Sequence, residues 1–338
     1  MSPRAKPLPS TKRQTPAARP ARPDLLSMRD FGDALERVLA AAASLKHASK
    51  LGRPVRLLEG KSAVLLFEKL STRTRVSFEI GLAKLGANVV FLSAKDIHLG
   101  KGSETIEDSA LVLSRYTDVL IYRSFSAEQV SELAAHASVP VINALDNREH
   151  PCQVAADLLT IREHKKRLKG LRFLYVGDGN NMCHSYLLGG AMTGMHVTAV
   201  TPAGYAPLPE IVEEARQLAK KAGGSVTLSH DIHAAGVFAD KDVIATDTWV
   251  SMGDETERDE RLKAFQGYTV TEERLAASPE AIFLHCLPAY YGNEVTHEVL
   301  HGPRSVVWDE AENRMWAQMG ILVWLILGED GLDHALRA

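Results

Sequence analysis

Short apolar runs alternate with helical patterns along the chain from about residue 30 onward. In the first half, the apolar runs that predict strands span residues 63–67, 88–92, 119–122 and 139–143. In the second half, such runs span residues 172–176, 196–200, 225–228, 243–246 and 282–285. Alternating strands and helices are typical of parallel sheets that are covered by helices on both faces. The pattern therefore predicts an α/β fold.

Several residues mark where the intervening helices begin and end. One helix is predicted to begin at about Thr72 and to end before Gly86, a residue type that favours helix C-termini. Residues 126–129 have the spacing of a capping box, which would open the next helix. A long helical pattern covers residues 150–169, and the most apolar helix covers about residues 309–327.

The two sets of strands predict two doubly wound parallel-sheet domains of similar size, joined by the long helix. We assign residues 26–165 to the first domain, residues 166–308 to the second, and residues 309–338 to a C-terminal helical segment. Ligands of doubly wound folds bind at the carboxyl ends of the strands, near helix N-termini. The chemistry of this chain is therefore expected just after the apolar runs.

Residues 1–25 differ from the rest of the chain. They contain several Arg, Lys and Pro residues, and the first acidic residue is Asp24. Such a composition cannot bury a core, which predicts a disordered tail. A transit peptide for organelle import is the alternative, because such peptides are rich in Arg and poor in acidic residues. The prolines argue against the amphipathic helix that a transit peptide would form.

The overall composition excludes several classes of protein. The 338 residues are 45 % hydrophobic and 24 % charged, as is ordinary for a globular protein with a large core. The formal net charge of −3 gives no global positive field for nucleic acid, and no apolar run reaches the ~18 residues of a membrane span. Cys152, Cys183 and Cys286 cannot form a disulfide framework. They suit a reducing compartment such as the cytoplasm.

A cluster of hydroxyl and guanidinium groups follows the first strand. Ser71, Thr72, Arg73, Thr74 and Arg75 open the helix that begins there. A helix N-terminus presents free N–H groups and the positive end of the helix dipole, and Arg adds a forked donor that matches phosphate. Two arginines oppose the dipole unless an anion is present, which favours a phosphate site over a solvated cap. The cluster lacks the glycines of a P-loop.

Three further clusters also follow predicted strands. His150 and Gln153 share one face at the start of the long helix and can bond a carbonyl or amide group, although a fixed turn is the alternative. Arg123 ends a strand, where a surface charge is common. Asp247 and Ser251 suit the ammonium and carboxylate groups of a ligand, or else a capped surface loop.

Two remaining clusters are informative through what they lack. Residues 176–181, Val-Gly-Asp-Gly-Asn-Asn, resemble a dinucleotide fingerprint, but Met182 stands where the third Gly belongs. Asn181 can still present an amide to a polar ligand. Cys286 follows His285, and neighbouring strand residues point to opposite faces, so His285 is badly placed to activate the thiol. The spacing of zinc ligands is absent.

Taken in order, these clusters resemble the ornithine carbamoyltransferases of the aspartate/ornithine carbamoyltransferase family. The matching blocks are Ser-Thr-Arg-Thr-Arg at 71–75, His-Pro-Cys-Gln at 150–153, Asp-Gly-Asn-Asn at 178–181, Ser-Met-Gly at 251–253 and His-Cys-Leu-Pro at 285–288. Single blocks occur widely, but five in series are specific, and the resemblance covers about residues 30–328. It implies an enzyme of arginine metabolism that transfers the carbamoyl group of carbamoyl phosphate to the δ-amine of L-ornithine, giving citrulline and phosphate.

The resemblance also implies an architecture. The first domain would bind carbamoyl phosphate, the second would bind ornithine, and the C-terminal helix would pack back on the first domain. Related enzymes are homotrimers with active sites at the subunit interfaces. The two substrates would be the other partners, and no metal or organic cofactor is required.

The resemblance assigns roles to individual residues. Those for carbamoyl phosphate are Ser71, Thr72, Arg73, Thr74, His98, Arg123, His150, Gln153, Cys286, Leu287 and Arg314. Those for ornithine are Asn181, Asp247, Ser251 and Met252. The catalytic candidates among them are Arg73, Arg123, His150 and Cys286. His98 stands where many bacterial relatives have Gln, in a loop that reaches the neighbouring subunit's phosphate site; either side chain donates a hydrogen bond.

A mechanism follows from these roles. The uncharged δ-amine attacks the carbamoyl carbon, and Thr74, Arg123 and His150 stabilise the oxyanion that forms. Phosphate then leaves, held by Arg73 and the helix start. Desolvation and neighbouring cations lower the pKa of the attacking amine. Water must be kept from carbamoyl phosphate, so domain closure and a moving Ser-Met-Gly loop are expected.

Three other functions stay open from the sequence. A sister carbamoyltransferase would act on putrescine, N-acetylornithine or aspartate. A catalytically silent relative would lack the phosphate arginines, whereas Arg73, Arg75 and Arg123 are all present. A nucleotide-binding oxidoreductase is disfavoured by the incomplete glycine pattern. The direction of the reaction, towards or away from citrulline, also stays open.

Overall fold

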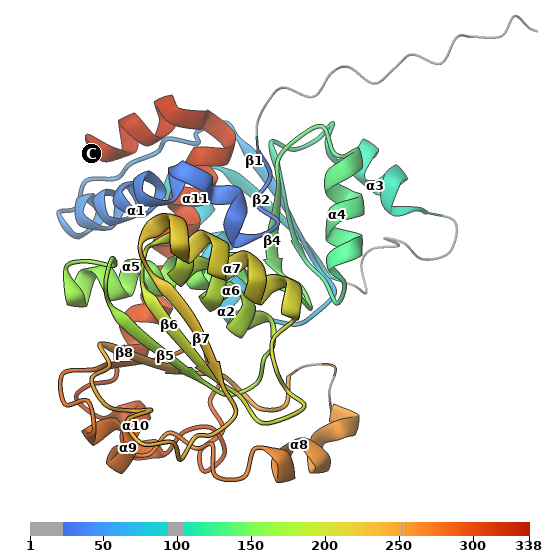
Figure 1. Cartoon of the computed structure of the whole chain (residues 1–338). Coiled ribbons are helices and arrows are strands. Elements are labelled where there is room, and N and C mark those ends of the chain that lie inside the picture. The colour runs from blue at the N-terminus through green and yellow to red at the C-terminus, as the bar shows by residue number, and fades with distance from the viewer. Residues whose placement is uncertain (1–22, 94–103, 252, 254) are drawn as a thin grey trace, which may run out of the picture.

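The computed structural model describes residues 23–93, 104–251, 253 and 255–338. It contains two separate parallel sheets (Figure 1). The first has the order β2-β1-β3-β4. Its strands are β1 (Ser62–Phe67), β2 (Asn88–Ser93), β3 (Val119–Arg123) and β4 (Val141–Leu145). The helices between them are α2 (Thr72–Leu85), α3 (Ile106–Leu113) and α4 (Ala127–His136).

The second sheet has the order β7-β6-β5-β8-β9. Its strands are β5 (Arg172–Val176), β6 (His196–Val200), β7 (Ser225–Ser229), β8 (Val243–Thr246) and β9 (Ile282–His285). The intervening helices are α6 (Asn181–Met192), α7 (Pro209–Ala222), η2 (Glu255–Glu257), α8 (Arg258–Ala264) and α9 (Glu272–Ala276), with α10 (His297–His301) after β9. In both sheets the order reverses beside the first strand, so each is doubly wound, as predicted.

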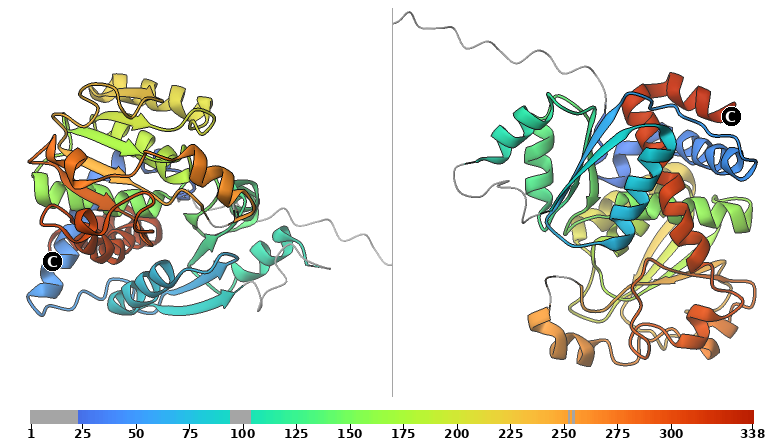
Figure 2. Two further views of the ribbon diagram at one scale, coloured as in Figure 1. Left: turned by 90° about the horizontal axis from the view of Figure 1, so that it is seen from below. Right: turned by 180° about the vertical axis from the view of Figure 1, so that it is seen from behind.

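Helices outside the two sheets hold the molecule together. These are η1 (Met28–Ala34), α1 (Leu35–Lys50), α5 (Pro151–Lys165) and α11 (Val307–Leu336). The chain passes from the first sheet to the second through α5, and α11 packs against α1, α2 and α5 (Figures 1 and 2). The predictions of a joining helix and of a C-terminal helix that returns to the first half are confirmed.

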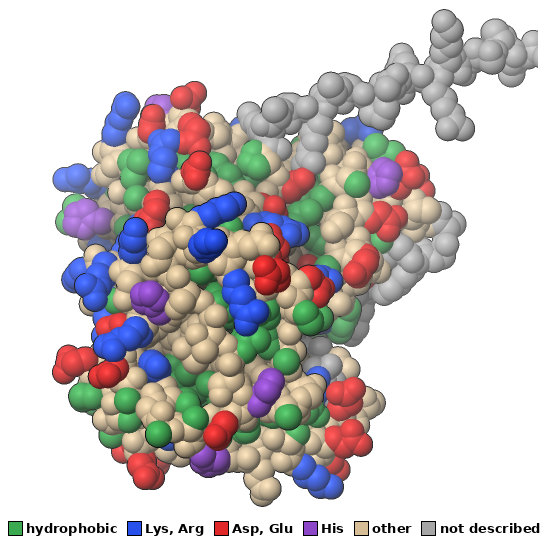
Figure 3. Space-filling model, in the orientation of Figure 1, with side chains coloured by type: hydrophobic (Ala, Val, Ile, Leu, Met, Phe, Trp, Pro, Cys, Tyr) green, Lys and Arg blue, Asp and Glu red, His purple; other side chains and the backbone are tan. Residues whose placement is uncertain are grey.

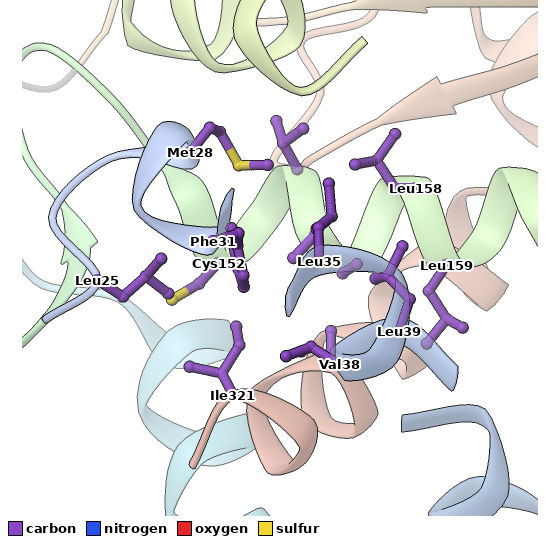
Figure 4. Close-up of a cluster of buried hydrophobic side chains, with 14 of the residues drawn as sticks. Leu25, Met28, Phe31, Leu35, Val38, Leu39, Cys152, Leu158, Leu159 and Ile321 are labelled. Atoms are coloured by element: carbon purple, nitrogen blue, oxygen red, sulfur yellow. The ribbon is translucent and has the colours of Figure 1, made fainter. Parts of the chain in front are cut away.

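The largest core lies where these helices meet. Figure 4 shows Met28, Phe31 and Cys152 among the side chains that fill it, together with Ile321 of α11. Leu25 also belongs to this core, since its N–H donates to the Val141 carbonyl and the side chain is fully buried. Leu25, predicted from the sequence to belong to the tail, is therefore part of the core, and residues 1–22 lie outside the described part of the chain.

Some predicted boundaries, and one predicted cap, differ in detail from the structure. The long helix ends at Lys165 rather than at residue 169, because Lys166 adopts a left-handed conformation with φ 65°. The capping box at α4 is half formed: Ser126 caps the N–H of Gln129, but the Gln129 side chain accepts from Ser124 instead. The strand expected at 139–143 begins two residues later, and α11 continues to Leu336 beyond a break at Gly328.

Among the described residues, no helix combines the length and the apolarity needed to cross a membrane. On the face shown in Figure 3, positive and negative side chains are interspersed. This mixed surface agrees with the small net charge of −3.

Candidate active site

A cavity of about 330 Å³ lies where the carboxyl ends of strands from both sheets meet. It is therefore at the place that the doubly wound topology predicts. The predicted residues that line it are Ser71, Thr72, Arg73, Arg123, His150, Asn181, Asp247, Ser251 and Cys286. Thr74 and Arg314 are buried behind this lining: the Ser71 hydroxyl donates to Thr74, and Arg314 donates to Thr74.

Thr74 is the centre of the cationic side of the cavity. Its Oγ1 lies 2.6 Å from Nη2 of Arg314 on α11 and 3.5 Å from Nη1 of Arg123 at the end of β3. Ser71 caps α2, because its Oγ accepts the N–H of Thr74 at 3.2 Å. The N–H groups of the first helical turn are thereby directed at the cavity, together with guanidinium groups from two other elements.

The third guanidinium group comes from the first turn of α2. Nη2 of Arg73 donates to the carbonyl oxygen of Leu287, which follows β9, at 2.6 Å. Arg75 points elsewhere: it pairs with Glu79 at 2.9 Å and stacks over the Phe91 ring at 3.6 Å. The two arginines that the sequence places together in one helical turn are therefore separated by the structure.

The cationic groups repel one another strongly. Burial, together with the neighbouring Arg314 and Arg73, lowers the pKa of Arg123 to about 9. Burial also lowers the pKa of Arg314, with Arg73 adding to the effect. Each of Arg123 and Arg314 keeps a buried Nε without a partner among the described residues. An anion in the cavity would relieve this repulsion, so the cluster has the electrostatic character of an anion site.

His150 faces the same cationic cluster from the start of α5. Its backbone N–H donates to Ser185 at 2.8 Å, whereas its side-chain Nδ1 is buried and has no partner in the part of the chain described. Burial, and then the charges of Arg314, Arg123 and Arg73, lower the pKa of His150 well below its usual value. The imidazole is therefore neutral and has one N–H to donate.

Gln153 lies one helical turn further along α5 and behind the cavity lining. Its Nε2 donates to Asp157 at 2.8 Å and to Glu310 at 3.1 Å. Its Oε1 is buried and has no partner among the described residues. The side chain thus offers an acceptor, and not a donor, to any ligand that reaches it.

The opposite side of the cavity carries polar groups from the second sheet. Asp247 follows β8 and is held by Asn180, whose Nδ2 donates to Oδ2 at 2.8 Å. Asn181 donates to the Asp146 carbonyl at 2.7 Å, and its amide oxygen has no donor among the described residues. Ser251 lines the cavity beside them. A carboxylate, an amide and a hydroxyl therefore face the three arginines across one small space.

The glycine-rich turn after β5 does not have the form of a dinucleotide site. The N–H of Gly179 donates to the carbonyl oxygen of Tyr205 at 2.9 Å, so it is occupied by the chain itself. A Cβ atom at this position would lie 2.2 Å from the backbone nitrogen of Pro207. The glycine is needed for this close approach of two backbone segments, which is the space that a pyrophosphate would use.

Asp247, His285 and Cys286 place their ligand atoms within 4.8 Å of one another in the described part of the chain. Such a trio suggests a metal site, but its atoms already take part in hydrogen bonds to one another and to neighbouring groups. His285 Nδ1 accepts the N–H of Leu287 at 2.9 Å and Nε2 lies 3.2 Å from Glu294. The Cys286 thiol donates to Asp247 at 3.1 Å, and burial with the adjacent Asp247 raises its pKa well above the usual value. The donor set therefore does not fit a resident metal ion.

Two predicted site residues, His98 and Met252, lie outside the described residues. Leu287 is present at the site through its carbonyl group, as the contact with Arg73 shows. Sequence reasoning missed several lining residues: Lys69, Leu70, Leu145, Met182, Thr248, Val250, Pro288 and Tyr290. Their positions in the sequence could have identified them, because each lies within a few residues of a predicted cluster or strand end.

Comparison with known proteins places most of the described part of the chain in one group. Residues 23–163 match the family model "Aspartate/ornithine carbamoyltransferase, carbamoyl-P binding domain", and residues 169–325 match "Aspartate/ornithine carbamoyltransferase, Asp/Orn binding domain". The ornithine carbamoyltransferase of Methanoculleus marisnigri is 50% identical over 90% of this chain and 97% of its own length. That of Thermococcus kodakarensis is 47% identical over 90% and 96%. The solved ornithine carbamoyltransferase of Pyrococcus furiosus superposes with a TM-score of 0.87 at 44% identity, covering 91% of this chain and 98% of that one.

Proposed function

This chain belongs to the aspartate/ornithine carbamoyltransferase family, and we propose that it carbamoylates the δ-amine of L-ornithine with carbamoyl phosphate. The products are citrulline and phosphate. One observation carries the proposal: the guanidinium groups of Arg123 and Arg314 meet at Thr74, and with Arg73 at the start of α2 they form a cationic cluster on the cavity that Asp247 also lines. The first group suits a phosphate and the second an amino acid.

Carbamoyl phosphate is held at the cationic side. The phosphate group binds Ser71, Thr72, Arg73 and Thr74 at the start of α2, where N–H groups and guanidinium nitrogens surround it. The carbamoyl oxygen accepts from Arg123, Thr74 and the neutral His150, which become oxyanion donors when the amine attacks. One such preorganised donor contributes roughly 10²–10³ in rate. Arg314 holds Thr74 in place and closes the site, and the carbamoyl N–H₂ donates to Gln153 Oε1.

Ornithine occupies the side formed by the second sheet. Asp247 pairs with its α-ammonium group, and Asn181, Ser251 and Met252 hold the rest of the α-amino acid end. The δ-amine then lies beside Cys286 and the Leu287 carbonyl, facing the carbamoyl carbon. The three arginines disfavour a further positive charge, so they lower the pKa of the bound δ-amine and promote its uncharged, nucleophilic form.

Each of the two domains, built on one sheet each, binds one of the two substrates. Residues 26–165 form the carbamoyl phosphate-binding domain, residues 166–308 form the ornithine-binding domain, and residues 309–338 return to the first. The family-model matches at 23–163 and 169–325 support the division near residue 165, and the second match extends beyond residue 308 into α11. No cofactor takes part in the reaction as proposed. The described cysteines Cys152, Cys183 and Cys286 are all free, which supports a cytoplasmic location.

The working unit is a homotrimer in which a neighbouring subunit contributes His98 to the phosphate site. Exposed apolar side chains next to the site support a partner surface there: Leu70, Val76, Ile80 and Val90, of which Leu70 is 82% exposed. Leu70 follows β1, Val76 and Ile80 lie on α2, and Val90 lies on β2, an edge strand of its sheet. Light scattering on the purified chain tests the assembly, and a mass of one chain would contradict it.

The reaction is tested by offering carbamoyl phosphate with ornithine, putrescine, N-acetylornithine and aspartate in separate assays. Citrulline from ornithine alone is the expected result. Carbamoylation of another amine would retain the phosphate site but overturn the role of Asp247 and Ser251. No product from any acceptor, with phosphate still bound, would identify a catalytically silent member of the family.

A further inference from the structure

Two buried carboxyl groups lie behind the cavity and take no part in the mechanism above. Asp157 lies on α5 and is fully buried, and Glu310 lies in the first turn of α11 and is 1% exposed. Both accept from the same nitrogen, Nε2 of Gln153, at 2.8 Å and 3.1 Å. One amide N–H₂ group therefore donates its two hydrogens to two different carboxyl groups.

The remaining oxygens of the pair differ in their partners. Oε2 of Glu310 accepts the backbone N–H of His285 at 2.9 Å, which ties the end of β9 to α11. Oδ2 of Asp157 is buried and has no donor in hydrogen-bonding geometry among the residues that the structure describes, although the Tyr186 hydroxyl group on α6 faces this carboxyl group. Burial raises the pKa of both groups, and the charge of Asp157 raises that of Glu310 further. A single proton held between the two groups supplies the missing donor and removes one of two buried like charges.

We propose that Asp157 and Glu310 form a proton-sharing pair that positions Gln153, fixing Nε2 inward and leaving Oε1 to accept from the carbamoyl N–H₂. The inference rests on the proposed function, because carbamoyl phosphate supplies that donor. Without this restraint, the Gln153 side chain would turn its own N–H₂ group towards the carbamoyl N–H₂ group about half of the time, and two donors would then face each other. Two inward acceptors make the productive orientation the only one that satisfies both ends of the side chain.

The groups around the pair are consistent with one retained proton. Arg314 on α11 is the nearby cation and favours ionisation of one carboxyl group. Tyr186 on α6 faces Asp157, and Cys286 beyond β9 is held neutral as a thiol. The His285 side chain points to Glu294 instead. One positive charge therefore balances one negative charge, and the second carboxyl group stays protonated.

The test compares binding of carbamoyl phosphate and of inorganic phosphate to the full chain by calorimetry. In Glu310→Gln, one side-chain oxygen cannot serve both Gln153 and His285, and the new N–H₂ group turns Gln153 Oε1 inward. We expect affinity for carbamoyl phosphate to fall about ten- to hundredfold. Affinity for phosphate should stay within about twofold, since the Arg73 and Thr74 site is untouched.

Two further variants make the test specific. Glu312→Gln removes the same charge from the same helix but outside the pair, where Glu312 contacts Lys46 and Trp316, and it should leave both affinities unchanged. Asp157→Asn keeps Oδ1 for Gln153 and replaces the shared proton with an Nδ2 donor to Glu310. It should fold and keep carbamoyl phosphate binding within about threefold.

Several outcomes would overturn the positioning role. They are undiminished carbamoyl phosphate affinity in Glu310→Gln, equal loss of both ligands in that variant, and lost carbamoyl phosphate affinity in Asp157→Asn. If Glu310→Gln does not fold, the Asp157→Asn result decides. Failure of the unmodified chain to bind carbamoyl phosphate, with phosphate bound, would instead remove the proposed function.

Discussion

The guanidinium group of Arg73 donates to the carbonyl oxygen of Leu287 at 2.6 Å, across 214 positions of the chain. Arg73 belongs to the first turn of α2 beside the first sheet, whereas Leu287 follows β9 of the second sheet. The bond therefore joins the two halves of the cavity. A phosphate group at the start of α2 would compete with this carbonyl for the Arg73 donors. Binding of carbamoyl phosphate is therefore coupled to the position of Leu287, which lies on the ornithine side of the cavity.

Replacement of Arg73 by Ala should lower kcat by about 10²–10³, because a charged donor to the phosphate is lost. The side chain is partly exposed, so the melting temperature should change little. Steady-state assays with ornithine and a thermal melt provide the measurement. Arg75→Ala is the matched control, since Arg75 pairs with Glu79 away from the cavity and should retain turnover. Near-normal activity in Arg73→Ala would remove the phosphate site from α2.

Replacement of Asp247 by Asn should raise KM for ornithine roughly 10- to 100-fold, because the charged acceptor for the α-ammonium group is lost. The shape of the side chain is kept, and the oxygen of the new amide can still accept from Asn180. KM for carbamoyl phosphate should stay within about threefold, which serves as the internal control. A rise in KM for carbamoyl phosphate, with KM for ornithine unchanged, would show that Asp247 contacts carbamoyl phosphate and not ornithine.

Replacement of Gly179 by Ala should destabilise the protein by about 3 kcal/mol, because the added Cβ meets the backbone of residues 206–207. Neither backbone segment can move without disturbing the turn that carries Asn180 and Asn181. Gly204→Ala is the comparison: Gly204 has φ 89° but open space around it, and should lose only about 1 kcal/mol. Urea unfolding of both variants measures the difference, and equal losses would contradict the packing argument.

The sequence predicts the strands well for a physical reason. Strands of a parallel sheet that is covered on both faces read as continuous apolar runs, and both ends of β5, β8 and β9 follow from that pattern. The same strands end at the cavity, which explains why the motifs lie there. The end of α5 was not predictable, because Lys166 leaves the helix while Leu168 is buried by tertiary packing.

The inner layer of the site could not be predicted from local pattern. Asp157 and Glu310 are separated by most of the second domain, and each reads alone as an ordinary charged residue on a helix. Their meeting at Gln153 depends on how α11 crosses α5. Arg73 faces the cavity and Arg75 faces away from it for a similar reason. The orientation of α2 about its own axis, which depends on tertiary packing, decides which of the two side chains reaches the cavity.

Glu149 makes the stability of the fold depend on pH. Its carboxylate accepts from Ser27 Oγ and from the N–H of Met28, and burial raises its pKa from 4.5 to about 7. A carboxyl group with a raised pKa in the folded state binds its proton more tightly when folded. Its contribution is therefore present below about pH 4.5 and is lost as the pH rises to about 7.

Replacement of Glu149 by Gln should remove this dependence. Between pH 5 and pH 8 the unmodified protein should lose about 2–3 kcal/mol of unfolding free energy relative to Glu149→Gln. Urea unfolding of both proteins at the two pH values gives the comparison, and other titrating groups cancel in it. Parallel curves for the two proteins would show that Glu149 keeps its ordinary pKa in the fold.

Thr74 is the residue whose hydroxyl group holds the cationic cluster together. Thr74→Val keeps the shape of the side chain but removes the acceptor of Arg314 and Arg123 and the partner of Ser71. We expect kcat to fall about 10²–10³-fold, since an oxyanion donor is lost and two buried guanidinium groups lose their anchor. Thr74→Ser should restore most of the rate. Ser77→Ala, one turn along α2, removes a hydroxyl whose one hydrogen bond within the described residues goes to the Thr74 carbonyl, and it should be neutral. Equal turnover in the Val and Ser variants would mean that the arginines are positioned without Thr74.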